Sequence, residues 1–116
     1  MKTPTLLNSV LVVVAILSPT ACAASCSKDS HADGGFAVSY IVDASGVPDI
    51  PGICGGLWDN LKGFPSCGGP TQTWCGGKNG NLEWRFTASI GCDGGSVDAV
   101  WWGATKNAWG DIQCPF

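Results

Sequence analysis

The chain has 116 residues, a formal net charge of −3, seven cysteines and six tryptophans. This length fits one modest domain. The six Lys and Arg residues form no cluster, which argues against nucleic acid or an anionic lipid surface as the main partner, because both require concentrated positive charge.

The first 23 residues have the pattern of a secretory signal peptide. An apolar run over 6–17 precedes small residues, with Ala21 and Ala23 in an A-x-A arrangement. The run is shorter than the roughly 20 residues that a membrane-spanning helix needs, so we expect no stable membrane insertion. A lipoprotein leader modified at Cys22 is the alternative, and Pro19 disfavours it. We predict cleavage near Ala23 or Ala24, with 1–23 as the leader. We expect the mature protein to be secreted, extracellular and monomeric.

Six cysteines follow the leader, and an even number in a short exported chain predicts three disulfides whose pairing the sequence leaves open. They are Cys26, Cys54, Cys67, Cys75, Cys92 and Cys114. A zinc site is the alternative. It is disfavoured because no C-x-x-C pair occurs and His31 is the sole histidine, so we expect neither metal nor cofactor. Without the leader the formal net charge is −4.

Residues 24–34 are small and polar, and we predict a flexible N-terminal arm held by Cys26, followed by a single domain over 35–116. The first predicted strand covers 35–44. Its large apolar residues alternate at period two, which indicates one buried face. They are Phe36, Val38, Tyr40 and Val42.

Residues 49–62 predict a helix. Asp49 is a suitable N-cap, Pro51 is tolerated in the first turn, and Gly63 is a suitable stop. The apolar residues have helical spacing. Gly55 and Gly56 each cost roughly 1 kcal/mol relative to alanine, so the helix depends on packing and on Cys54 being bridged.

Two further strands are predicted over 71–76 and 81–90, joined at the Asn79-Gly80 step, which is a strong hairpin signal. The second alternates between apolar and polar residues, which indicates one buried and one solvated face. Its apolar members are Leu82, Trp84, Phe86, Ala88 and Ile90.

Ser96 can cap a second helix from 97 to about 107, in which Asp98 and Lys106 suit the helix dipole. The alternation of Ile112, Cys114 and Phe116 predicts a last short strand. The order is therefore β-α-β-β-α-β, an α+β split sandwich whose antiparallel four-stranded sheet carries two helices on one face. An all-β sandwich stapled by disulfides is the alternative.

Catalytic residues are not evident. His31 with Glu83 and Arg85 would supply the acid–base set of a small ribonuclease, but an ordinary surface placement of these three explains them more simply. Asp93 and Asp98 lack an apolar pocket that would raise the pKa of either carboxyl group for glycosidase chemistry. We therefore predict a protein that is not an enzyme.

Tryptophan is unusually frequent. Trp58, Trp84 and Trp101 fall on predicted core faces, whereas Trp102 and Trp109 do not. Exposed tryptophans are favoured anchors at interfaces and can stack on a sugar ring. We name Trp102 and Trp109 as candidate partner-binding residues, together with Arg85 and Glu83 on the solvated face of the 81–90 strand.

The leader, the short mature chain, the six cysteines, the abundant Gly and Trp and the predicted element order resemble small secreted cysteine-rich proteins of filamentous fungi. More narrowly, they resemble effectors that share the fold of virus-encoded killer toxins of smut fungi. This resemblance implies binding of a host or competitor protein or a surface ligand, without catalysis. A secreted antimicrobial or killer-type toxin and a small secreted ribonuclease are the alternatives.

Overall fold

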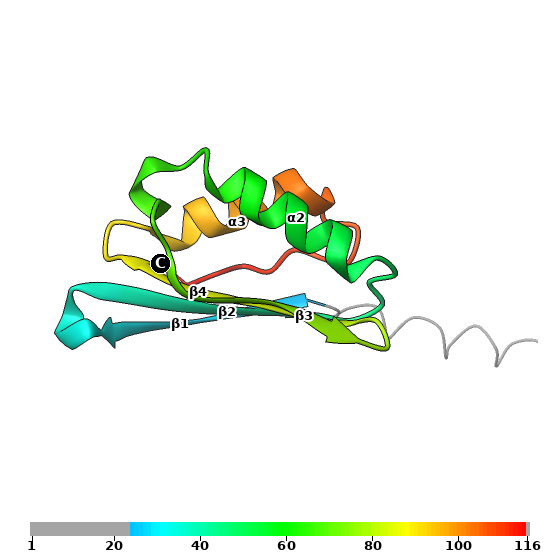
Figure 1. The fold of residues 1–116 in the computed structure, drawn as a ribbon, viewed down its shortest axis with the longest axis horizontal. Helices are drawn as coiled ribbons and strands as arrows, with labels where there is room; N and C mark the ends of the chain where they lie inside the picture. Colours follow the sequence, from blue (N-terminus) through cyan, green and yellow to red (C-terminus); the bar gives the residue numbers. More distant parts are fainter. Residues whose placement is uncertain (1–23, 116) are drawn as a thin grey trace, which may run out of the picture.

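A computed structural model describes residues 24–115, so the predicted leader over 1–23 and Phe116 lie outside the described residues. One four-stranded antiparallel sheet carries two helices on one face (Figure 1), which confirms the predicted α+β class. The strands are β1 (Ala24–Ala32), β2 (Ala37–Ala44), β3 (Thr71–Lys78) and β4 (Asn81–Ser89), in the spatial order β1-β2-β4-β3. Asn79 and Gly80 form the β3–β4 hairpin with φ values of 56° and 80°, as that dipeptide predicts.

The order of elements along the chain differs from the prediction and is β-β-α-β-β-α. The segment expected to be a flexible arm instead contains β1, an edge strand paired with β2, and the short 3-10 turn η2 (Asp33–Gly35). Its small polar side chains gave little strand signal because β1 depends on pairing with β2 and on its disulfide.

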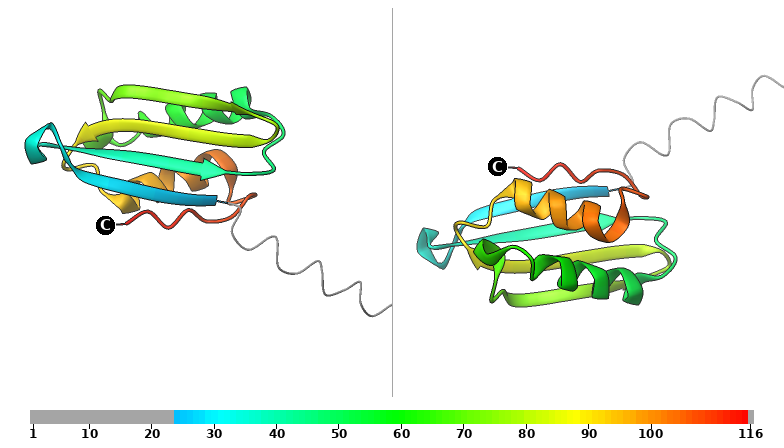
Figure 2. Two further views of the ribbon diagram at one scale, coloured as in Figure 1. Left: turned by 90° about the horizontal axis from the view of Figure 1, so that it is seen from below. Right: turned by 90° about the horizontal axis from the view of Figure 1, so that it is seen from above.

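The predicted C-terminal strand is absent from residues 111–115, which form no ladder. Ile112 and Cys114 are buried, so the alternation correctly indicated a buried side. Two backbone N–H groups in this segment donate to carboxylates and not to the carbonyl groups of a neighbouring strand. The amide of Cys114 donates to Asp98 Oδ1 at 2.7 Å, and the amide of Gln113 donates to Asp111 Oδ1 at 3.2 Å. The segment runs alongside β1 (Figure 2).

Helix α2 (Ile50–Leu61) matches its prediction, including the N-cap, where Asp49 Oδ1 accepts from the amide of Gly52 at 3.2 Å. Helix α3 (Gly94–Thr105) begins earlier than predicted. Asp93, not Ser96, is its N-cap, and Asp93 Oδ1 accepts from the amide of Ser96 at 2.9 Å. Asp98 serves to hold the C-terminal segment.

The core lies between the sheet and the helices. Its largest fully buried side chains come from β2, β4, α2 and α3, and they are Tyr40, Trp84, Phe86, Leu57 and Trp101. Trp58 is half-buried and meets Trp84 edge to face, with 6.1 Å between ring centroids. Phe36 and Ile90 were expected to be buried but are exposed, because each lies just past the end of its strand.

Three disulfides form, as the cysteine count predicted. Cys26–Cys114 fastens β1 to the C-terminal segment, Cys54–Cys75 fastens α2 to β3, and Cys67–Cys92 joins the turn η3 (Pro65–Cys67) to the loop before α3. Intramolecular disulfides of this number are typical of extracellular proteins.

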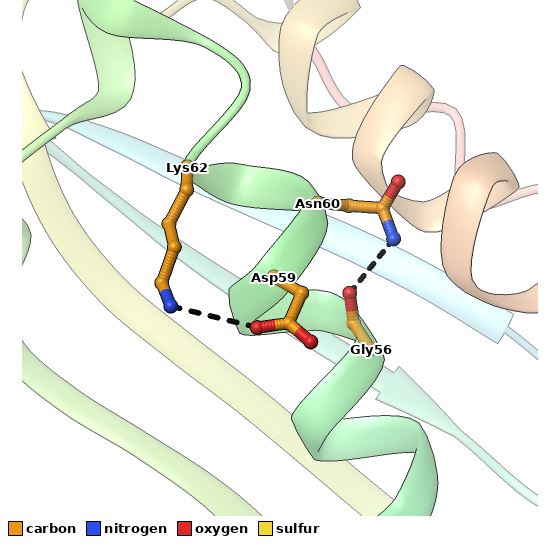
Figure 3. A network of polar contacts seen from close by, with 4 residues as sticks. All are labelled: Gly56, Asp59, Asn60 and Lys62. Atoms are coloured by element: carbon orange, nitrogen blue, oxygen red, sulfur yellow. Dashed lines mark hydrogen bonds and ion pairs between the residues drawn. The ribbon is translucent and has the colours of Figure 1, made fainter.

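The two helices approach each other closely at small residues. A Cβ on Gly103 would clash with Asn60 Oδ1, while Asn60 Nδ2 donates to the carbonyl of Gly56 at 2.8 Å, which leaves the Asn60 side chain directed toward α3 (Figure 3). Gly56 therefore faces α3. Gly55 has open space around it, so of the two glycines only Gly56 lies at a close approach, and that approach is to α3 instead of the sheet.

Candidate functional site

The predicted partner-binding residues lie on two separate surfaces. Glu83 and Arg85 are on β4 and face away from the helices. We call this side of the sheet the open face. It comprises Ser39, Ile41 and Asp43 of β2, Gln72, Trp74 and Gly76 of β3, and Glu83, Arg85 and Thr87 of β4. Trp102 is on α3, and Trp109 follows that helix. No described element covers the open face (Figure 2).

Strand register places Trp74 beside Arg85, a neighbour that the sequence analysis missed. Ile41 pairs with Arg85, and Arg85 pairs with Trp74, so these three side chains form one row across β2, β4 and β3. Neighbouring strands are about 4.8 Å apart, which brings the side chains of such a row into contact range. The signal was Cys75: once it bridges to α2, the preceding residue must face the opposite side of the sheet.

The indole of Trp74 leans along β3 over Gly76. Three consecutive ring atoms lie within 3.5 Å of the position that a Cβ on Gly76 would take, and the nearest is Cζ2 at 3.0 Å. Trp74 remains 50% exposed. Glycine at position 76 therefore provides the space in which the ring lies along the strand, with much of its surface in solvent.

A hollow of about 450 Å³ opens between Trp74 and strands β2 and β4. Hydroxyl and amide groups line it: Ser39 Oγ and Thr87 Oγ1 are 2.7 Å apart, and Thr87 Oγ1 donates to Gln72 Oε1 at 3.1 Å. Gln72 has a φ of 51°, at an irregularity in the β3–β4 pairing. The hollow thus combines an aromatic wall with a hydrogen-bonding floor.

Charged groups lie at one side of this hollow. Arg85 Nε is 3.4 Å from Glu83 Oε2, and both side chains are partly exposed. Glu83 is also paired across the strands with Asp43. Desolvation, followed by the charge of Glu83, raises the pKa of the Asp43 carboxyl group. These three residues leave the open face with a small negative charge.

The structure does not assemble the ribonuclease set. His31 is near the end of β1 beside η2, where Ala32 pairs with Ala37, whereas Glu83 pairs with Asp43. At about 3.3 Å per residue this separates His31 from Glu83 by roughly 16 Å along the strands. His31 Nδ1 is instead 3.5 Å from its exposed neighbour Asp29.

The two tryptophans predicted for partner binding differ in exposure. Trp102 is 53% exposed. Lys106 Nζ lies over the Trp102 ring, 4.0 Å from its centroid, so the two side chains form a cation–π contact. Trp109 is half-buried and packs against the core. Neither lies near Arg85 and Glu83, because the helical layer and the open face are on opposite sides of the sheet (Figure 1).

Within residues 24–115, no group of three or more His, Cys, Asp or Glu side chains is arranged to hold a metal ion. Among the described residues, no helix combines the length and the apolar character that a membrane span requires. Comparisons of the chain with protein-family models, with curated proteins and with solved structures found no match.

Proposed function

We propose that the protein is exported and acts by binding an extracellular partner through the open face of its sheet, without catalysing a reaction. The observation that carries this proposal is the half-exposed Trp74 beside Arg85, above a hollow that no described element fills. Tryptophan and arginine are the residue types most enriched at energetically important contacts. The leader pattern and the three disulfides support export.

The cysteine content and short mature chain also support an effector-type role, directed at a host or at competing microbes, for a chain that works as a monomer. Infiltration of purified protein into leaf tissue and its addition to cultures of rival fungi separate these two targets. An effector produces a plant response. Growth arrest of the rivals with no plant response would instead favour the killer-type toxin.

Binding through the open face is tested by capture from plant extracellular fluid and from fungal culture medium. We compare immobilised wild type, the double variant Trp74→Ala/Arg85→Ala and the control Trp102→Ala, which removes an equally exposed tryptophan from the helical layer. The double variant should lose the captured molecule, and Trp102→Ala should retain it. Equal capture by all three proteins would contradict the proposal.

A further inference from the structure

We propose that the hollow beside Trp74 binds a neutral polysaccharide chain, with the indole stacking on one sugar ring and the floor and side of the hollow bonding to its hydroxyl groups. This inference rests on the proposed function, because it names the chemical class of the partner for the same open face. Binding of a neutral polysaccharide requires an aromatic platform, a polar border and little net charge. The open face has each of these.

Trp74 supplies the platform. A pyranose ring presents an apolar face of C–H groups, which packs against the π surface of an indole. The ring of Trp74 leans over Gly76 and is half-exposed, so part of it is accessible to a ligand before binding. Because glycine has no side chain, nothing at position 76 lifts the indole from the strand.

The polar border matches the hydroxyl rim of a sugar. Within the hollow, Arg85 offers guanidinium donors, and Gln72 and Thr87 offer an amide and a hydroxyl. Glu83, the ion-pair partner of Arg85, offers carboxylate acceptors beside the hollow. A sugar hydroxyl both donates and accepts, so it can bond to each of these groups. The volume of about 450 Å³ is within the range of small-ligand sites.

The charges favour a neutral ligand. Arg85 is paired with Glu83, and Asp43 adds a second carboxylate opposite Glu83, so carboxylates outnumber the single guanidinium group beside the hollow, which disfavours a phosphate, a nucleic acid or an acidic polysaccharide. The net charge of −4 after the predicted leader opposes polyanions further.

A protein partner fits these features less well. The centres of protein interfaces are depleted of charged residues and bury their anchors in well-packed pockets. Here two carboxylates, Glu83 and Asp43, lie opposite each other next to the row of Trp74 and Arg85, and hydroxyl groups line the hollow. The exposed ring of Trp74 and the neighbouring Ile41, together with small polar groups, suit a polyhydroxylated chain, because a sugar presents both C–H and O–H surfaces.

The experiment titrates soluble hexasaccharides of β-1,3-linked glucose, β-1,4-linked glucose and β-1,4-linked N-acetylglucosamine into the disulfide-bonded protein. Affinity is measured by calorimetry, and the indole N–H signals are followed by NMR. We expect saturable binding of at least one of the three, with a shift of the Trp74 signal. Affinity should change little between about 0.1 M and 1 M salt, because the ligand is uncharged.

The variants test the geometry. Trp74→Ala should lower affinity at least tenfold and Trp74→Phe less, while Trp102→Ala should stay within twofold of wild type. Gly76→Val keeps the indole but displaces it, because even a Cβ would lie 3.0 Å from Trp74 Cζ2, and it should lower affinity severalfold. Circular dichroism confirms that each variant is folded.

Absence of saturable binding to all three glycans, or equal affinity of wild type and Trp74→Ala, would overturn the inference. If the glycans fail but Trp74→Ala/Arg85→Ala still loses a captured protein, the polysaccharide is wrong and the open face stands as the binding surface. If the double variant also captures like wild type, both the inference and the proposed function are wrong.

Discussion

The two faces of the sheet are made from alternate residues of the same strands, yet they differ in burial, polarity and charge. On β4, Trp84 is fully buried under the helices while its neighbour Arg85 is exposed on the open face. On β3, Cys75 bridges to α2 while Trp74 faces the other side. The difference teaches that the position of a tryptophan within a strand, more than the abundance of tryptophan, separates core residues from exposed ones.

The largest expected effect contrasts Trp84 with Trp74. Trp84→Ala should lower the free energy of unfolding by about 3–5 kcal/mol, because it removes a fully buried ring from the core. Trp74→Ala should change it by about 0.5 kcal/mol or less, because the ring is half-exposed. Urea denaturation measures both. A large loss in Trp74→Ala would show that this residue is structural and would weaken its role in binding.

The second prediction concerns the disulfide that joins α2 to the covered face of β3. Replacing Cys54 and Cys75 by alanine should lower the free energy of unfolding by about 3 kcal/mol, as expected for a cross-link spanning 21 residues. Because α2 contains two adjacent glycines and depends on this bridge, helical circular dichroism should also decrease, and reduction of the wild type should do the same. An unchanged helical signal after reduction would contradict this account of α2.

The covered face should respond to alkali through Tyr40. Desolvation, followed by the charges of Asp93 and Asp98, raises the pKa of this buried phenol to about 12. The folded state therefore holds the proton more tightly than the unfolded state, so this stability is complete below about pH 10 and is lost as pH rises toward 12. The loss should reach about 2–3 kcal/mol.

Tyr40 is the single tyrosine of the chain, so absorbance at 295 nm reports its ionisation directly. Tyr40→Phe is the control. It loses the hydrogen bond to the carbonyl of Cys92 at 2.7 Å, and it should be less stable at neutral pH but show a weaker decline above pH 10. A phenol that ionises near pH 10 in the folded protein would disprove its burial.

Much of the covered face could be predicted from the sequence, because burial imposes periodicity. The alternation in β2 and β4, the Asn79-Gly80 turn and the cap at Asp49 each left a local signal, and each was confirmed. The sequence of β1 carried no such local signal, because this edge strand of small polar residues is held by pairing with β2 and by the Cys26–Cys114 disulfide. On the open face, the solvated position of Arg85 and Glu83 was predicted and is confirmed, whereas their role in binding stays a prediction.

Trp74 was missed because its strand contains adjacent glycines and no apolar alternation, and because its orientation depends on which cysteine pairs with Cys75. Six cysteines leave that pairing open in the sequence. The prediction of a C-terminal strand was wrong for a different reason. Its burial alternates as in a strand, but its amides bond to Asp98 and Asp111, and alternation reports burial without reporting hydrogen-bond partners.

The helical layer itself offers a smaller test. Gly55→Ala should raise the free energy of unfolding by about 1 kcal/mol, because no atom lies near its added methyl group and alanine favours helix. Gly103→Ala is the matched control: its methyl group would clash with Asn60, which bonds to Gly56, so it should gain less or destabilise. Thermal unfolding compares them, and an equal gain in both would show that the helices are not closely packed there.

The smallest effect is expected on the open face, at Asp43. Its carboxyl group has a raised pKa in the folded state, so ionisation of Asp43 works against folding, and its protonated form is favoured. Asp43→Asn should therefore stabilise the protein by a few tenths of a kcal/mol at neutral pH, a small gain because the residue is solvent-exposed. The gain should vanish below the pKa of an unfolded aspartate, where wild-type Asp43 is protonated in both states. Chemical denaturation at neutral and acidic pH measures this difference. A variant that is destabilised at neutral pH would show that the folded state favours the ionised carboxylate of Asp43, against the direction of its pKa shift.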